Sequence, residues 1–103
     1  MTTGITLCIS QSLAKELGPS NIRVNAIRPG IVEGPRVESV ILNRAERVGV
    51  SCAEMENRYL EKTSLRRMVT AGDVAAAIMF PMSDAARNLS GQPIAVDGNV
   101  ETL

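Results

Sequence analysis

The residues with the clearest chemical potential lie in one stretch, Ile22–Pro35, which reads IRVNAIRPGIVEGP. Apolar residues there run into the turn Pro29-Gly30, which opens into a loop. In a doubly wound α/β sheet, backbone that leaves the carboxyl end of a strand in this way meets a bound cofactor. The alternative is a plain strand end, because Pro-Gly favours turns in any fold.

Side chains that commonly bind metals are scarce. The sequence has no histidine, and its two cysteines, Cys8 and Cys52, lack the spacing of metal ligands. We therefore expect no metal site and two reduced thiols in a cytoplasmic protein. No secretory signal follows Met1. The longest apolar run, Val74–Phe80, is far too short to span a bilayer, so no membrane partner is expected.

The overall composition narrows the function classes further. A length of 103 residues allows one domain, and 45% apolar residues indicate a folded chain. Eleven basic residues balance eleven acidic ones, so nucleic acid is not an expected partner. With one Tyr, one Phe and no Trp, the chain also lacks a platform for stacking bases.

Helix and strand signals alternate along the chain. Thr2 or Thr3 can cap a first helix that runs to about Leu17, where Gly18 supplies its C-terminal cap. Capping boxes at Ser51–Glu54 and Thr70–Asp73 predict two later helices. Four helices are predicted: one to residue 17, one at 37–48, one at 51–62 and one that begins at residue 70 and is broken by Pro81 in its last turn. Two strands are predicted, at 22–27 and at 94–96.

Two strands alone make only a marginal sheet in water. The long, mostly helical connection between Ile22–Ile27 and Ile94–Val96 indicates that they are parallel and joined by a right-handed crossover. We therefore expect an α/β fold that is incomplete as it stands, with further strands N-terminal to this sequence.

Three stretches together resemble the C-terminal portion of a short-chain dehydrogenase/reductase. They are SLAKELGPSNIRVNAIRPGIV (Ser12–Val32), RRMVTAGDVAAAIMF (Arg66–Phe80) and SGQPIAVDGN (Ser90–Asn99), which follow one another in the family's order. Within the first, Asn25 to Gly30 matches the family's N-x-x-x-P-G element. One such motif would be weak, but three in order make the resemblance specific.

The resemblance implies that residues 1–103 are the C-terminal fragment of a single NAD(P)-binding, Rossmann-type domain with a doubly wound parallel sheet. Residues 1–18 would form a helix of the active-site and interface region, and residues 22–35 the strand and nicotinamide-side loop. Residues 36–65 would form substrate-lid helices, and residues 70–103 the last helix and strand. The cofactor would be NAD or NADP, with Pro29, Gly30, Ile31 and Val32 against the nicotinamide.

The chain departs from the family's pattern near that loop. The family carries Thr four residues after the glycine of Pro-Gly, and this chain has Gly34, which removes a hydroxyl and adds backbone freedom. The family's final Asp-Gly-Gly reads Asp97-Gly98-Asn99, a mild change because Asn tolerates left-handed backbone. Arg36 follows at the mouth of the expected lid and could pair with a substrate carboxylate or phosphate, or be a surface charge.

The family's catalytic residues are absent from this sequence. Its glycine-rich turn, Ser and Tyr-x-x-x-Lys would lie upstream, so no catalytic residue is assigned here. Tyr59 and Lys62 are three residues apart rather than four and follow the Pro-Gly strand, which favours a solvated amphipathic helix.

Two functions remain open from the sequence. The resemblance implies an NAD(P)-dependent oxidoreductase that acts on a small alcohol or ketone, as a homo-oligomer in the intact protein. The isolated chain, without the Ser/Tyr/Lys group, would be inactive. The alternative is a non-catalytic oligomerisation or interaction subunit that joins intact family members.

Overall fold

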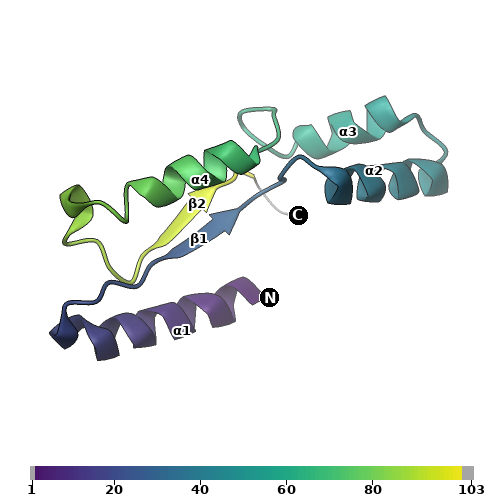
Figure 1. Ribbon diagram of the computed structural model, residues 1–103. Coiled ribbons are helices and arrows are strands. Elements are labelled where there is room, and N and C mark those ends of the chain that lie inside the picture. Colours follow the sequence, from purple (N-terminus) through teal and green to yellow (C-terminus); the bar gives the residue numbers. More distant parts are fainter. Residues whose placement is uncertain (1, 101–103) are drawn as a thin grey trace. The chain divides into compact units, whose positions relative to one another are not determined.

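The computed structural model describes residues 2–100, with side chains from Cys8 onward (Figure 1). It has the expected α/β composition. The helices are α1 (Thr2–Leu17), α2 (Pro35–Val48), α3 (Cys52–Leu60) and α4 (Ala71–Met79), with short 3₁₀ turns η1 (Gly18–Ser20) and η2 (Asp84–Ala86); the strands are β1 (Ala26–Pro29) and β2 (Pro93–Val96).

Two compact units make up the chain. The first holds the residues up to Arg28 together with Gly72–Val96, and the second holds Pro29–Ala71 together with the chain from Asp97. The first unit therefore contains the sheet, α1 and nearly all of α4, whereas the second contains α2 and α3.

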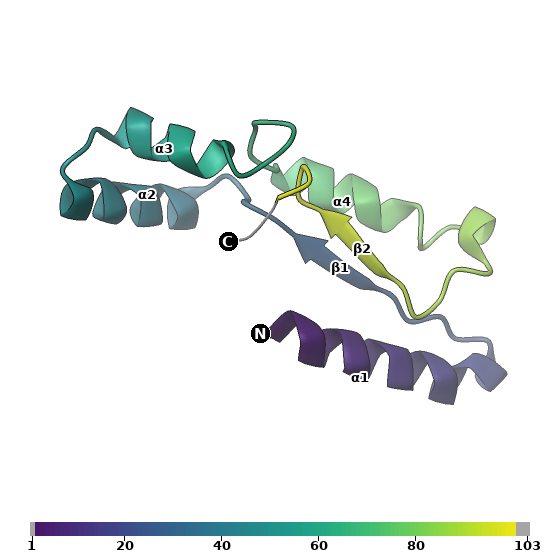
Figure 2. The same ribbon diagram turned by 180° about the vertical axis from the view of Figure 1, so that it is seen from behind.

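The sheet has the predicted pairing. β1 and β2 are neighbours in a two-stranded sheet, and their arrows point the same way from both sides of the molecule (Figures 1 and 2). Because parallel strands cannot be joined by a tight hairpin, the whole segment from α2 to η2 serves as the connection between them.

The predicted first strand is misplaced by four residues at its start. The prediction was Ile22–Ile27, whereas β1 spans Ala26–Pro29. The backbone N–H of Val24 donates to the hydroxyl of Ser90 at 3.2 Å, and the side-chain amide of Asn25 donates to the carbonyl of Leu89 at 3.0 Å. Val24 and Asn25 therefore form hydrogen bonds with the loop before β2, and these bonds are made partly through side chains. They do not form the regular backbone-to-backbone pattern of a β-sheet.

Both helices end where predicted, α1 at Leu17 and α2 at Val48, but only one of the two glycines that follow them acts as the predicted cap. Gly49 closes α2 with a φ of 81°, and its N–H donates to the carbonyl of Ala45 at 2.9 Å. Gly18 was predicted to cap the first helix, but the chain continues into η1, and Asn21 takes the left-handed conformation with a φ of 61°. Pro at the second position of η1 favours this extra turn because its φ is already helical.

The second unit is built on a hairpin of two helices. Buried Ile41 and Ala45 from α2 pack against Met55 from α3. Four half-buried residues surround this cluster: Val37, Val50, Tyr59 and Met68. α3 begins where the capping box predicted, since the Ser51 hydroxyl accepts a hydrogen bond from the N–H of Glu54 at 3.1 Å.

The first unit leaves much apolar surface uncovered by the described residues. No residue of α4 is buried. The helix ends at Met79, as Pro81 predicted, and Met79, Phe80 and Met82 are 67%, 59% and 71% exposed.

One side chain links the segment before β1 to the loop after α4. The guanidinium of Arg23 donates to the carbonyl oxygens of Pro81, Ala86 and Ser83, the last two at 2.9 and 3.3 Å. A planar group with five N–H donors can satisfy several carbonyls at once, so Arg23 organises the loop that leads to β2.

Candidate functional site

The loop after β1 is held by one residue of a distant segment. The N–H of Val69 donates to the carbonyl of Ile31 at 2.7 Å, and the N–H of Glu33 donates to the carbonyl of Val69 at 2.8 Å. These two bonds form an isolated parallel bridge between Val32 and Val69. The bridge fixes the backbone of Ile31–Glu33 although no regular strand continues there.

The same bridge leaves the peptide groups of Val32 turned outward. In extended backbone, the groups of successive residues point to alternate sides, so Val32 points its N–H and C=O away from Val69. Among residues 2–100, neither group has a hydrogen-bond partner. The loop therefore presents one donor and one acceptor, side by side, on rigid backbone.

Gly30 packs against the residue that follows β2. A Cβ added to Gly30 would lie 2.6 Å from Cβ and 2.8 Å from Cα of Asp97. Only glycine fits this position, since real Cβ atoms do not approach other carbons so closely. The neighbour that Gly30 approaches in the structure is Asp97. The contact of Gly30 with a nicotinamide stays a prediction.

A hollow of about 450 Å³ opens beside this loop, within the second unit. All four residues predicted to contact a cofactor contribute to it, as does Arg36, the predicted substrate-side residue. Its lining consists of Pro29, Gly30, Ile31, Val32, Arg36, Val37, Val40, Arg44, Tyr59 and Lys62.

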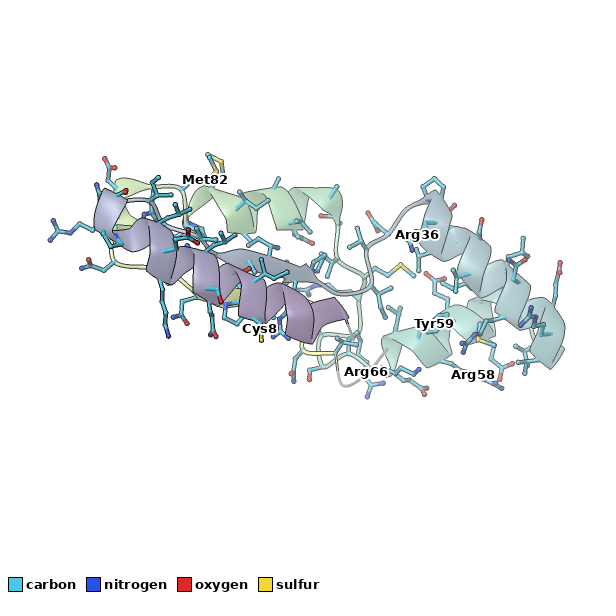
Figure 3. All side chains as sticks on the ribbon, turned by 90° about the horizontal axis from the view of Figure 1, so that it is seen from below. Cys8, Arg36, Arg58, Tyr59, Arg66 and Met82 are labelled. Atoms are coloured by element: carbon cyan, nitrogen blue, oxygen red, sulfur yellow. The ribbon has the colours of Figure 1, made fainter. Side chains whose placement is uncertain are left out.

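Sequence reasoning missed half of this lining. Arg36, Val40 and Arg44 recur every four residues, a spacing that places them on one face of α2 and could have identified them. Tyr59 was assigned to a solvated helix, yet it is half-buried and packs against the core between α2 and α3. Figure 3 shows Arg36 at the start of α2 and Tyr59 on α3.

Gly34 does not line the hollow, although it was predicted on the substrate side. It is the N-cap of α2, with a φ of 151° and a ψ of −179°, a conformation that side chains of L-residues rarely adopt. A Thr at this position, as in the family's pattern, would be strained in the present backbone. The glycine therefore sets how α2 begins, and Pro35 follows as its first residue.

Two cations share the ring of Tyr59. The guanidinium carbon of Arg44 lies 6.0 Å from the ring centre, and the Lys62 ammonium lies 5.6 Å from it. Each such contact contributes about 0.5–1 kcal/mol at an exposed site. Among the described side chains, Arg36, Arg44 and Lys62 form no ion pair, whereas Arg58 on the same α3 pairs with Glu54 at 3.2 Å.

The remaining reactive groups are dispersed. Cys8 and Cys52 are both exposed free thiols. In the described part of the chain, no three His, Cys, Asp or Glu side chains gather as a metal site would require. Over the same residues, no helix is both long and apolar enough to cross a bilayer.

Comparisons with known proteins find close likenesses. A family model described as "Enoyl-(Acyl carrier protein) reductase" matches residues 4–100. The chain is 36% identical over 92 residues to a "Probable galactose dehydrogenase" of Rhizobium meliloti, covering 89% of this chain and 32% of that protein. It is 32% identical over 96 residues to carbonyl reductase (NADPH) 2 of Sus scrofa, covering 93% of this chain and 36% of the relative.

A solved structure has a similar fold. The crystal structure of a short chain dehydrogenase family protein from Francisella tularensis superposes with a TM-score of 0.85 at 29% identity, covering 92% of this chain and 39% of that one. The chain thus spans about a third of the length of the curated relatives it matches.

Proposed function

Because the chain belongs to the short-chain dehydrogenase/reductase family, we propose that it forms the nicotinamide side and substrate side of an NAD(P)-dependent oxidoreductase acting on a CH–OH or ketone group. The observation that carries this proposal is that the N–H and C=O of Val32 point away from Val69 and have no partner among the described residues. They belong to a loop beside a hollow that all four predicted cofactor residues line.

The described residues fit a nicotinamide cofactor. A carboxamide offers one carbonyl acceptor and one amino donor, which match the unpartnered N–H and C=O of Val32. Val32 is half-buried and lines the hollow, so its side chain also offers apolar surface for a ring. The cofactor would supply hydride transfer, and this chain would orient the ring and exclude water.

Proton transfer would come from outside this sequence. In the family a Tyr exchanges a proton with the substrate oxygen, a Lys lowers the pKa of that Tyr, and a Ser holds the oxygen. We propose that these residues and the glycine-rich dinucleotide turn are encoded N-terminal to Met1. The 103-residue chain alone would then be inactive, because it positions reactants without an acid or base.

Substrate contact would come from the start of α2. Arg36 lines the hollow and is exposed, so its guanidinium can reach a ligand there. Gly34 would contribute indirectly, by setting the direction in which α2 leaves the loop. We also propose that the intact protein is cytoplasmic and forms a homo-oligomer, as the family resemblance implies.

Nuclear magnetic resonance can test the cofactor role on the chain itself. Saturation transferred from the protein to NADH or NADPH should reach the nicotinamide protons more strongly than the adenine protons, because only the nicotinamide side is present. Val32→Pro removes the outward N–H without removing either bond to Val69, and it should weaken this transfer. Stronger transfer to adenine, or none to either ring, would contradict the proposal.

An enzyme assay tests the inactivity of the chain. Purified protein with NADH or NADPH and a panel of ketones should show no protein-dependent oxidation of the cofactor. Turnover by the 103-residue chain would show that the acid-base residue lies within it.

The alternative, a non-catalytic interaction subunit, is favoured by one observation. Met79, Phe80 and Met82 form an apolar surface that the described residues leave open. The reading frame upstream of the Met1 codon discriminates between the two functions. An in-frame Tyr-x-x-x-Lys and glycine-rich turn supports the oxidoreductase, whereas a genuine start site at Met1 supports the interaction subunit.

A further inference from the structure

The hollow beside the nicotinamide-side loop is lined by both apolar and positively charged residues. Val37 and Val40 contribute apolar surface, and Arg36, Arg44 and Lys62 contribute three positive charges. No acidic residue belongs to the lining. This distribution is local, because the whole sequence has equal numbers of acidic and basic residues.

The two cations at Tyr59 make this arrangement unusual. Both Arg44 and Lys62 lie within 6.0 Å of the same ring centre and line the same hollow, so two like charges are placed around one ring. Among the described side chains, no carboxylate pairs with either of them. Like charges repel, and a bound anion would remove that repulsion. The Tyr59 ring also lines the hollow and adds an apolar contact for the same ligand.

We propose that this hollow binds the anionic end of the substrate, a carboxylate or phosphate attached to a short apolar part. Arg44 and Lys62 hold the anion at the edge of the Tyr59 ring, and Arg36 adds charge at the start of α2. The assignment of this ligand as the substrate rests on the proposed oxidoreductase function, since the same hollow includes the predicted nicotinamide-side residues.

Tyr59 provides a direct measurement, because it is the only Tyr in a chain without Trp. Its fluorescence therefore reports on the proposed site alone. Octanoate should change Tyr59 emission saturably, and octanamide, which has a similar shape but no charge, should bind about ten-fold more weakly. Added salt should weaken octanoate binding and leave octanamide binding unchanged. Equal binding of the two ligands would overturn the proposal.

Charge-removing variants locate the anion. Arg44→Gln and Lys62→Gln should each weaken octanoate binding about five- to ten-fold without changing octanamide binding. Arg47→Gln is the matched control, because it removes the same charge from α2 at an exposed position outside the lining. An effect of Arg47→Gln as large as that of Arg44→Gln would show that overall charge, and no specific site, attracts the ligand.

The source of the anion is decided by competition. Inorganic phosphate that displaces octanoate at equal concentration indicates a phosphate-bearing substrate, and displacement by acetate but not by phosphate indicates a carboxylate. Displacement by neither, even at high excess, would show that octanoate binds through its chain alone and would contradict the proposal.

A second measurement avoids variants that fail to fold. Phenylglyoxal modifies arginines, and peptide mass spectrometry locates the modified residues. Octanoate should slow the modification of Arg44 in the unaltered chain and leave Arg47 unchanged. Equal protection of both would contradict the proposal. Neither experiment requires NAD(P), so an anion site can be found even if the oxidoreductase proposal fails, and can be absent even if cofactor binding is confirmed.

Discussion

Gly30 and Asp97 meet where β1 and β2 end. A Cβ on Gly30 would lie 2.6 Å from the Cβ of Asp97, closer than two non-bonded carbon atoms can approach. The obstacle includes the Asp97 backbone, 2.8 Å away at Cα, so it cannot rotate aside as a flexible side chain could. The turn at Asp97 is itself fixed, since its carboxylate accepts a hydrogen bond from the N–H of Asn99 at 2.8 Å.

Gly30→Ala should therefore destabilise the chain by about 1–3 kcal/mol, through overpacking against fixed backbone. Urea unfolding followed by circular dichroism measures the loss. Gly18→Ala is the matched control, because nothing lies within 4 Å of its added Cβ and its φ is not positive. Similar midpoints for the two variants would show that Asp97 yields easily.

Gly34→Thr restores the residue of the family's pattern and should destabilise the chain by about 1–3 kcal/mol, because the φ of 151° is accessible to glycine alone. Nothing lies within 4 Å of an added Cβ, so the cost would come from the backbone rather than from a clash. Gly34→Ala should cost a similar amount in the same urea experiment. A neutral Ala variant beside a destabilised Thr variant would point to crowding instead.

Arg23→Met should loosen the loop at residues 81–86 by removing its three bonds to backbone carbonyls. The carbonyls of Ser83 and Ala86 keep the hydrogen bonds that they accept from the N–H groups of Ala86 and Leu89. The carbonyl of Pro81 loses its partner among the described residues, which costs about 1–3 kcal/mol. Hydrogen exchange of the amides in that loop should accelerate, while exchange in α2 and α3 should not change. Arg87→Met, at an exposed position, provides the control. Unchanged exchange in the Arg23 variant would show that the loop is held by other contacts.

Ser51→Ala should destabilise α3 by about 1 kcal/mol, because the N–H of Glu54 loses its hydroxyl acceptor. The urea midpoint and the exchange of the first amides of α3 measure this effect. Ser39→Ala, at an exposed position within α2, should be neutral or slightly stabilising, because Ala is the better helix former. The prediction is wrong if both alanine variants behave alike.

The chain should self-associate through the apolar surface after α4. Phe80 and Met82 are 59% and 71% exposed, and the paired substitutions Phe80→Ser and Met82→Ser should shift sedimentation velocity profiles toward the monomer. Leu42→Ser, at a 47% exposed position of α2, should have no such effect. A concentration-independent monomer before any substitution would contradict this prediction.

Local signals in the sequence determined the helices, two of their caps and the family. Ser51 and Glu54 fixed the start of α3, and Gly49 fixed the end of α2, because a cap depends on residues within one turn of each other. The strand was predicted to end at Ile27, before the Pro29-Gly30 turn, and β1 ends two residues later, at Pro29. The start of β1 could not be located from Ile22 onward, since the partners of Val24 and Asn25 lie in a distant loop.

Only the tertiary structure decided which residues meet in the hollow. Arg44 and Lys62 belong to separate segments and reach the same Tyr59 ring because Ile41, Ala45 and Met55 pack α2 against α3. Gly30 likewise acquires its neighbour because two strands end together in a parallel sheet. Such contacts depend on how elements pack across long stretches of chain, and no short-range pattern of residues encodes that packing.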